Sequence, residues 1–325
     1  MKAFIRDTLI ALVAVWTASI SAHAAELAKI DMVVFGPPSL GAFLTPIIKS
    51  KKMDEKHGIV INFVERTPGA YAAQFNSGEF KVGGSAALLS VAVASSRGVK
   101  VSYLFNLFDY FGAVVTEHPD IKTTKDLMGK QLVAATATTN YAMFRWLAMN
   151  QGVDLQKVSV QNTATPGLIG YAMANRADAV QLWEPAYSIL LAQKPTMRTL
   201  DLGMPQLWKK TFGTDDVPYL GVAAHQDWIE KNPELVKKMY ATFKDAATWV
   251  RANPAEGAKL IAASIKGSDP AILRKLIEDN GRLGLNVRSA SEVKTGIEAV
   301  YKAGLQSGYL KAAVDPATIY SGLGK

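Results

Sequence analysis

Apolar runs alternate with amphipathic stretches through the first hundred residues of the chain. The runs 30–35, 59–64, 80–83 and 99–107 predict strands, and the stretches between them carry apolar residues at helical spacing. Ser85 is placed to cap the helix after the third run, and this helix is apolar on every side, which predicts that it is buried. Strands joined by crossover helices favour parallel pairing, so the pattern indicates an α/β fold.

The same alternation restarts after residue 120. Strands are predicted over 131–135, 158–161 and 179–182, and helices begin near Asn140 and Thr165. The chain therefore holds two arrays of strand, helix and strand in tandem. They repeat in pattern and not in residues.

The last of these strands ends on the turn Trp183-Glu184-Pro185. In an open α/β sheet, ligands bind beyond the carboxyl ends of the strands, so Trp183 and Glu184 are predicted to lie on an exposed loop that faces a cleft. Alternatively, Trp183 packs in the core and Glu184 only favours the N-terminus of the next helix, which Pro185 opens. At the level of the sequence both interpretations stay open.

The C-terminal third returns with one strand, 220–224, and is predicted to be helical from there to its end. These helices need an apolar surface to cover, and we expect them to cover the first array. Three pairs of a capping residue and a proline mark where they begin: Asn232-Pro233, Asn253-Pro254 and Asp269-Pro270.

This return makes the chain cross twice between the arrays, near 106–112 and near 217–221. We therefore expect residues 25–106 and 221–325 to form a first lobe and residues 107–220 a second lobe. Two connecting segments predict a hinge with a central cleft between the lobes.

The N-terminus has the pattern of a secretory signal peptide. Two basic residues precede an apolar stretch over 8–20, and Ala22-His23-Ala24 fits cleavage after Ala24. The stretch is too short for a stable membrane span, and no later segment approaches about 18 consecutive apolar residues. Residues 1–24 are expected to be removed, which leaves a mature chain exported to the periplasm without direct membrane insertion.

Composition describes a soluble globular protein, with 49% hydrophobic and 20% charged residues. The formal net charge is +8, or about +7 without the two basic residues and one acidic residue of the leader. This excess favours anionic solutes only weakly, because the charges are dispersed. No run of them resembles a patch for nucleic acid, and we expect no nucleic-acid partner.

The chain contains no cysteine. A bacterial lipid anchor, a disulfide framework and a zinc–thiolate site are therefore excluded. The histidines are scattered, so we expect neither a metal site nor a cofactor; they are His23, His57, His118 and His225.

With these pieces assembled, the chain resembles the periplasmic solute-binding proteins of ABC importers, in the group that binds aliphatic sulfonates, taurine, nitrate and thiamine-type pyrimidines. Three segments carry the resemblance in the order typical of that family: 126–131 (DLMGKQ), 177–185 (ADAV, then WEP) and 228–236 (WIEKNPELV). The resemblance implies the two-lobe type II binding-protein fold, with mixed, largely parallel sheets flanked by helices. It also implies lobe closure on a small-molecule solute and docking of the closed form on an ABC permease.

The resemblance places the solute among five loops, and several of their Ser, Thr and Asn residues lie at predicted helix N-termini, where free N–H groups favour an anion or a carbonyl oxygen. For each such residue alone, a plain capping role is the alternative. The candidate ligand-binding residues are Gly36, Pro37, Pro38, Ser39, Gly84, Ser85, Asn106, Phe108, Asp109, Tyr110, Thr136, Thr138, Thr139, Asn140, Tyr141, Trp183, Glu184 and Tyr219.

The sequence departs from the sulfonate and taurine members at Thr136-Ala137-Thr138, where they often carry Gly-Ser, and at Lys81, where they often carry Asp. Aromatic rings near the predicted cleft favour a planar or mixed-polarity solute instead, although Phe105 and Phe111 are expected in the core. Asp109 and Glu184 would accept hydrogen bonds from ring N–H or amino groups and would repel a bare anion.

Two other functions remain open. An enzyme on the same fold, similar to the pyrimidine synthase or the menaquinone-pathway members, is disfavoured by the absence of cysteine and by export, and no catalytic motif is present. A receptor that docks on a sensor instead of a permease is not distinguished from the first hypothesis. The sequence predicts a binding protein that performs no chemistry.

Overall fold

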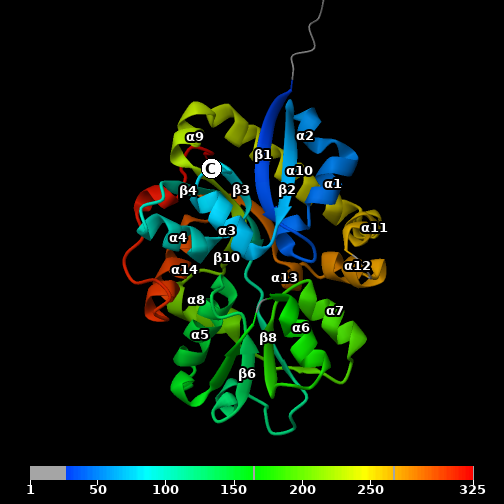
Figure 1. The fold of residues 1–325 in the computed structure, drawn as a ribbon, viewed down its shortest axis with the longest axis vertical. Coiled ribbons are helices and arrows are strands. Elements are labelled where there is room, and N and C mark those ends of the chain that lie inside the picture. Colours follow the sequence, from blue (N-terminus) through cyan, green and yellow to red (C-terminus); the bar gives the residue numbers. More distant parts are fainter. Residues whose placement is uncertain (1–26, 164, 266–267, 325) are drawn as a thin grey trace, which may run out of the picture.

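Two mixed β-sheets, one above the other in Figure 1, organise the chain. The computed structural model describes residues 27–163, 165–265 and 268–324, so the predicted signal peptide lies outside the described residues. The first sheet has the strand order β11 (Leu285–Ser289), β4 (Val101–Asp109), β10 (Pro218–His225), β3 (Val82–Ala87), β1 (Ala28–Phe35) and β2 (Ile59–Arg66).

The second sheet is smaller. Its strand order is β7 (Ser159–Asn162), β6 (Gln131–Ala134), β8 (Ala179–Leu182), β5 (Ala113–Thr116) and β9 (Arg198–Thr199). In each sheet three strands are parallel, β2, β1 and β3 in the first and β7, β6 and β8 in the second. The remaining strands pair antiparallel. The predicted α/β class with mixed sheets is confirmed.

Helices flank both sheets. Around the first sheet lie α1 (Thr45–Lys51), α2 (Met53–Lys56), α3 (Pro68–Asn76), α4 (Leu88–Ser96), α9 (Gln226–Lys231), α10 (Pro233–Ala252), α11 (Pro254–Ser264), α12 (Pro270–Glu278), α13 (Asn280–Leu283) and α14 (Lys294–Gln306). With the second sheet lie α5 (Thr139–Asn150), α6 (Thr165–Met173), α7 (Ala186–Gln193) and α8 (Met204–Phe212). None of the described helices combines the length and the apolar character that a membrane crossing needs.

The apolar alternation of the strands divides the core of the first sheet into two layers. Met32 and Val34 of β1 face one layer, under α10 and α11, whereas Val33 faces the other, under α3 and α4. Burial on both faces explains why these strands read as continuous apolar runs. The C-terminal helices cover the first sheet as predicted, with α10 against β2, β4 and β11 and α14 against β10.

The boundary between β3 and α4 differs from the prediction. The strand runs over 82–87 instead of 80–83, and α4 begins at Leu88, with Ala87 at its N-cap. Ser85 therefore lies inside a strand and caps no helix. Its Oγ accepts a hydrogen bond from the Phe35 N–H at 2.8 Å, and the side chain is fully buried. The predicted burial of α4 is confirmed for five of its six apolar residues, and the sixth, Val93, is half-buried.

The C-terminal third also differs from the prediction, because it is not helical throughout. Residues 285–289 form β11, which pairs antiparallel with β4 at the edge of the first sheet. The three helices predicted to begin at proline are present, but only Asp269 caps with its side chain. Asn232 and Asn253 instead donate their amides to the carbonyls of Trp228 and Trp249, at the ends of the preceding helices.

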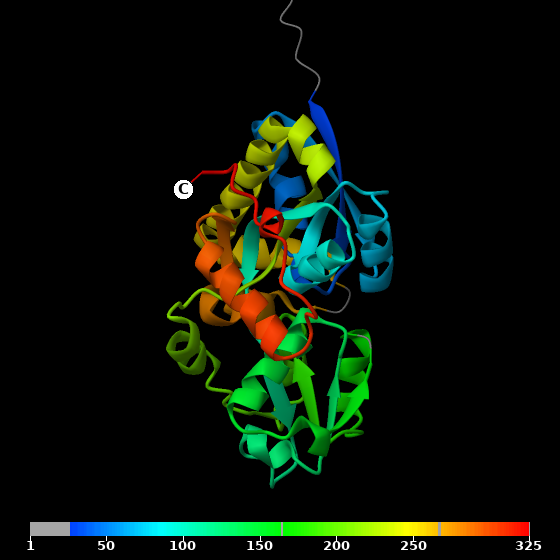
Figure 2. The same cartoon turned by 90° about the vertical axis from the view of Figure 1, so that its left-hand side faces the viewer.

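The backbone passes between the sheets at two neighbouring places. It leaves β4 at Asp109 for β5, and it enters β10 at Pro218 after β9 and α8. Figure 2 shows α14, in orange, reaching the level at which the green helices of the second sheet begin. There the indole N–H of Trp146 on α5 donates to Gln306 of α14 at 2.7 Å. The two sheets are thus joined both by chain crossings and by side-chain contacts.

Candidate functional site

The carboxyl ends of the parallel strands of both sheets point to the level where the sheets meet (Figure 1). The segments that follow β1, β6 and β8 are three of the five loops predicted to contact a ligand. One polar cluster in this region joins the sheets. It consists of Tyr110 after β4, Tyr219 in β10, Asn140 at the start of α5 and Gln181 in β8.

Asn140 lies at the centre of this cluster. Its amide nitrogen donates to the Tyr219 hydroxyl at 2.5 Å, and its backbone carbonyl accepts from the Tyr110 hydroxyl at 3.3 Å and from the Gln181 amide at 3.2 Å. The rings of Tyr110 and Tyr219 meet edge to face, with centroids 6.0 Å apart. Burial raises the pKa of both phenols well above the usual value, so both hydroxyls stay protonated.

Not all buried polar atoms of this region have partners. Within the part of the chain that the structure describes, Thr139 Oγ1, Asn140 Oδ1 and Gln181 Oε1 are buried and make no hydrogen bond, and the same holds for Tyr71 Oη beside the first sheet. Tyr71 packs edge to face on Phe35, at the end of β1, with ring centroids 4.7 Å apart. Buried polar groups are normally paired, so unpaired ones are candidates for contact with a ligand.

Sequence reasoning missed three residues of this region, namely Tyr71, Gln181 and Tyr309. The hydroxyl of Tyr309, which follows α14, donates to the Ala137 carbonyl at 3.0 Å and thereby reaches the loop after β6. Gln181 carried a readable signal, because it is an amide within the otherwise apolar strand β8 and is fully buried there. Tyr71 and Tyr309 carried none.

Glu184 was predicted to lie on an exposed loop, and its burial contradicts that expectation. Its side chain is buried and accepts hydrogen bonds from the backbone N–H and the hydroxyl of Ser188 at 3.1 and 2.9 Å. Arg282 of α13 lies 3.3 Å away. Burial raises the pKa of Glu184, against the lowering influence of Ser188 and Arg282. These contacts with Ser188 agree with the alternative interpretation, in which Glu184 favours the N-terminus of α7.

Trp183, beside Glu184, is half-buried and packs against the core of the second sheet. Phe108 does not reach the region between the sheets either. It is fully buried in β4, with its ring 6.0 Å from that of Phe43. The expectation that Phe105 lies in the core is confirmed, and Phe111 is partly buried against Tyr187.

Asn106 and Asp109 form a second polar network, where β4 ends. Asn106 Oδ1 accepts from the Tyr103 hydroxyl and the Tyr219 N–H, and its amide nitrogen donates to Asp109 and to the Asn286 carbonyl. Asp109 also accepts from the Asn286 amide at 2.6 Å. Burial raises the pKa of Asp109 to about 6, against the lowering influence of Asn286, Arg288 and Asn106. Both side chains are occupied by the protein itself.

The remaining candidates divide between the two sheets. Gly84 is in β3, where a Cβ would come within 2.5 Å of Met32 Sδ, so it serves strand packing. Thr138 is a plain N-cap that accepts from the Tyr141 N–H, and Tyr141 packs on Phe144. Thr136 donates to the Asn162 side chain. After β1 lie Gly36, Pro37, Pro38 and Ser39, with Pro38 exposed and the others half-buried.

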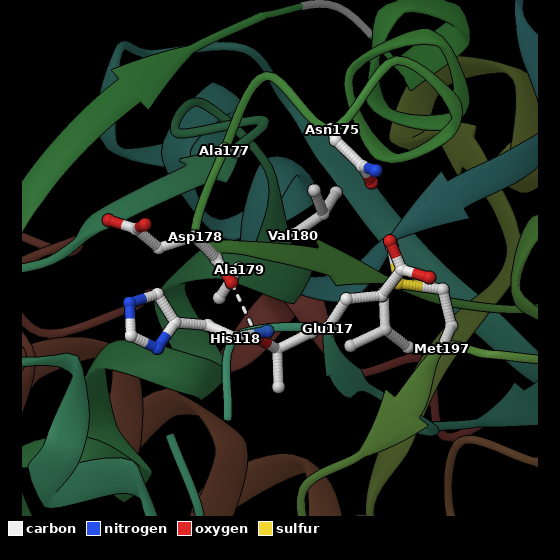
Figure 3. Close-up of a pocket in the computed structure, with 10 residues that line it drawn as sticks. Glu117, His118, Asn175, Ala177, Asp178, Ala179, Val180 and Met197 are labelled. Carbon is white, nitrogen blue, oxygen red and sulfur yellow. Dashed lines mark hydrogen bonds between the residues drawn. The ribbon is translucent and has the colours of Figure 1, made fainter. Parts of the chain in front are cut away.

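Two cavities lie away from this region. One, of about 170 Å³, opens at the amino end of β8, where Glu117, His118 and Asp178 border an apolar floor (Figure 3). The other, of about 270 Å³, lies between α9 and the C-terminal segment and is bordered by Ser102, Gln226 and Tyr320. None of the candidate residues lines either cavity. Within the described residues, no group of three or more acidic, histidine or cysteine side chains is arranged to hold a metal ion.

Comparisons with known proteins agree with this architecture. A family model described as NMT1/THI5 like matches residues 55–257. A relative from Brucella abortus, provisionally named a binding protein, is 23% identical over 291 residues, which is 86% of each chain.

Among solved structures, the periplasmic aliphatic sulphonate binding protein SsuA from Escherichia coli aligns with a TM-score of 0.72 and 19% identity, over 91% of this chain and 92% of that one. The alkanesulfonate-binding protein SsuA from Xanthomonas axonopodis pv. citri, bound to MOPS, aligns with a TM-score of 0.69 and 17% identity, over 90% and 97%. At these identities the likeness establishes the fold and leaves the ligand open.

Proposed function

We propose, since the chain belongs to the NMT1/THI5-like family, that it is an extracytoplasmic solute-binding protein. It captures a small organic solute or oxyanion between the two sheets and delivers it to an ABC permease. The fold shared with periplasmic binding proteins supports this proposal, as does the name of the Brucella relative. The protein would act in the periplasm, after removal of the predicted signal peptide, and would perform no chemistry.

The single observation that carries the proposal is the cluster around Asn140. It brings the N-terminus of α5 from the second sheet against Tyr219 and Tyr110 of the two crossings, and it leaves buried polar atoms without partners. A protein that had only to hold its two halves together would gain by pairing these atoms. We infer that the solute occupies this region and completes their hydrogen bonds.

Release of the solute requires the two predicted lobes, 25–106 with 221–325 and 107–220, to separate. The two backbone crossings would bend as hinges. Separation would break contacts that join the sheets through side chains, among them those of Trp146 with Gln306, of Asn140 with Tyr219, and of Arg282 with Glu184 and Ser188.

The test is a thermal-shift screen of the mature protein, unfolded and refolded to remove any retained solute. The screen covers sulfonates, nitrate, pyrimidines and aromatic carboxylates. A solute at 100 times its dissociation constant adds roughly 2.7 kcal/mol to the free energy of unfolding, or about 4 °C in melting temperature for a chain of this size. Any solute that binds should also reduce the radius of gyration in small-angle scattering. Binding without compaction would contradict lobe closure.

A further inference from the structure

The last turn of α14 reaches from the first sheet to the second (Figure 2). Gln306, in this turn, accepts a hydrogen bond from the Trp146 indole at 2.7 Å. Tyr309, just beyond the helix, donates to the Ala137 carbonyl at 3.0 Å. Both partners belong to α5 and the loop that leads into it. One short segment of the chain therefore holds α5 at two points.

This segment is fixed to the first sheet. Gly308 has a φ of +70°, in the left-handed region that favours glycine, and it follows the end of α14. Beyond it, the N–H groups of Tyr309 and Leu310 both donate to the Gly304 carbonyl. The Leu310 side chain is buried, and a Cβ on Gly304 would come within 2.8 Å of the Leu89 side chain of α4. The segment thus packs on α4 and moves with it.

The partners of this segment are fixed to the second sheet. Trp146 is fully buried and packs on Trp208 and Phe212 of α8, with ring centroids 5.2 and 5.3 Å away. The first turn of α5 carries Asn140, the centre of the polar cluster between the sheets. A displacement of α5 would therefore displace this cluster. Gln306 and Tyr309 act on the cluster through α5.

Both hydrogen bonds join neutral groups and can be exchanged for bonds to water. Gln306 is exposed and Tyr309 is half-buried, so water reaches both side chains when the sheets separate. An indole N–H can only donate, so the amide oxygen of Gln306 faces Trp146. Burial raises the pKa of Tyr309, so its hydroxyl stays protonated and remains a donor. Breaking these bonds leaves no charge buried.

We propose that Gln306 and Tyr309 form a clasp, which holds α5 against the first sheet while the two halves are closed and must be released before they separate. Both are positioning residues, since they act on the proposed solute region through α5. The inference rests on the proposed function, in which the two predicted lobes separate. The clasp sets the balance between closed and open protein, and its effect is the same whichever solute binds.

A distance measurement by double electron–electron resonance tests the clasp without any solute. The chain contains no cysteine, so Lys100→Cys with Gln156→Cys introduces the only two sites for spin labels. Both positions are exposed, Lys100 just before β4 and Gln156 between α5 and β7. In the refolded, solute-free mature protein we expect a closed and an open population of distances.

Two variants of the labelled protein each remove one bond of the clasp. Tyr309→Phe removes only the hydroxyl, and Gln306→Met removes the acceptor at nearly constant volume. Each lost hydrogen bond should raise the ratio of open to closed protein by about fivefold. Gln306→Glu keeps an acceptor for Trp146 and should stay close to the wild-type ratio.

Tyr301→Phe is the matched control for Tyr309→Phe. Tyr301 also belongs to α14, but its hydroxyl bonds Thr318 at 3.3 Å, within the same half of the molecule. This variant loses a hydroxyl of the same kind without touching the second sheet. Its ratio of open to closed protein should equal that of the wild type, whatever happens to its free energy of unfolding.

The outcomes separate the clasp from the proposed function. A merely structural role would lower the free energy of unfolding in Tyr309→Phe and Gln306→Met and leave the distance ratio unchanged, which would overturn the inference. An equal shift in Tyr301→Phe, or a wild type that is already fully open, would also overturn it. The proposed function is tested separately, by mass spectrometry of small molecules released on unfolding of the natively purified protein. A released solute with an unshifted ratio would support that function and reject the clasp.

Discussion

Two buried polar networks lie close to each other in this protein, joined through Tyr219, and they differ in how completely they are paired. Around Asn106, the side-chain oxygen accepts from two donors and the amide nitrogen donates to two acceptors. Around Asn140, three neighbouring polar atoms have no partner within the described residues. Pairing stabilises a fold, whereas unpaired buried atoms cost free energy unless something completes them. The fully paired network around Asn106 therefore stabilises the crossings, whereas we propose that a solute completes the network around Asn140.

Removing Asn106 should have the largest effect. Asn106→Ala abolishes four hydrogen bonds and leaves buried groups on Tyr103, Tyr219 and Asn286 unpaired. We expect a loss of roughly 3 to 4 kcal/mol in the free energy of unfolding, measured by denaturant titration. If the free energy of unfolding fell by less than about 1 kcal/mol, the network around Asn106 would stabilise the fold no more than the network around Asn140.

Asp109 gives the paired network a dependence on pH. Its pKa in the folded state, about 6, lies above the ordinary value of 3.8. At a pH between these two values, Asp109 therefore binds a proton when the protein folds. Stability from this group is present at low pH and is lost as pH rises through about 6. The contribution amounts to at most about 3 kcal/mol.

The Asp109→Asn variant lacks the titrating group but keeps all the other carboxyls. The free energy of unfolding of the variant, subtracted from that of the wild type at each pH, therefore isolates the contribution of Asp109. The difference, wild type minus variant, should grow as pH falls from 7.5 to 4.5. A difference that is constant over this range would show that Asp109 does not titrate there.

The ion pair between Arg282 and Glu184 joins the two halves at another point. Arg282→Ala leaves the buried carboxylate with Ser188 alone, and we expect a cost of about 1 to 2 kcal/mol. The radius of gyration of the solute-free protein should rise, since a contact between the halves is lost. Arg274→Ala, which breaks an exposed pair with Glu278 within α12, is the matched control and should cost less than about 0.5 kcal/mol.

The smallest effect on stability is expected for Gln181→Met. The variant loses one hydrogen bond but also removes an unpaired buried oxygen, so the two contributions oppose each other. We expect a change within about 1 kcal/mol in the free energy of unfolding. A loss as large as that of Asn106→Ala would mean that Gln181 belongs to the fold and not to a solute site.

The sequence predicted the fold well where apolar periodicity was unambiguous, as in β1, β2 and α10. It failed at β3, because Gly83 and Gly84 carry no side chain and contribute nothing to a hydrophobic pattern. The packing that requires them is long-range, since a Cβ on Gly84 would meet Met32. It failed at β11 because this short strand pairs at the sheet edge with β4, far away in the chain.

The candidate site was predicted less completely. Asn140, Tyr110 and Tyr219 do meet between the sheets, but Glu184 does not contribute. Its partner Arg282 lies almost a hundred residues further along the chain, and no local pattern reveals such an ion pair. Gln181 could have been found, since an amide inside an apolar strand must either pair or serve a ligand. The polar residues of the loops indicated where the candidate site lies. Only the hydrogen bonds of the structure show which polar atoms in it have no partner.

A crystal structure of the natively purified mature protein would show most directly whether a solute binds between the two sheets. We expect a solute between the two sheets with polar atoms within about 3.2 Å of the side-chain amides of Gln181 and Asn140. A solute found instead in the cavity beside His118 (Figure 3), or Gln181 paired with another side chain while a solute binds elsewhere, would contradict it.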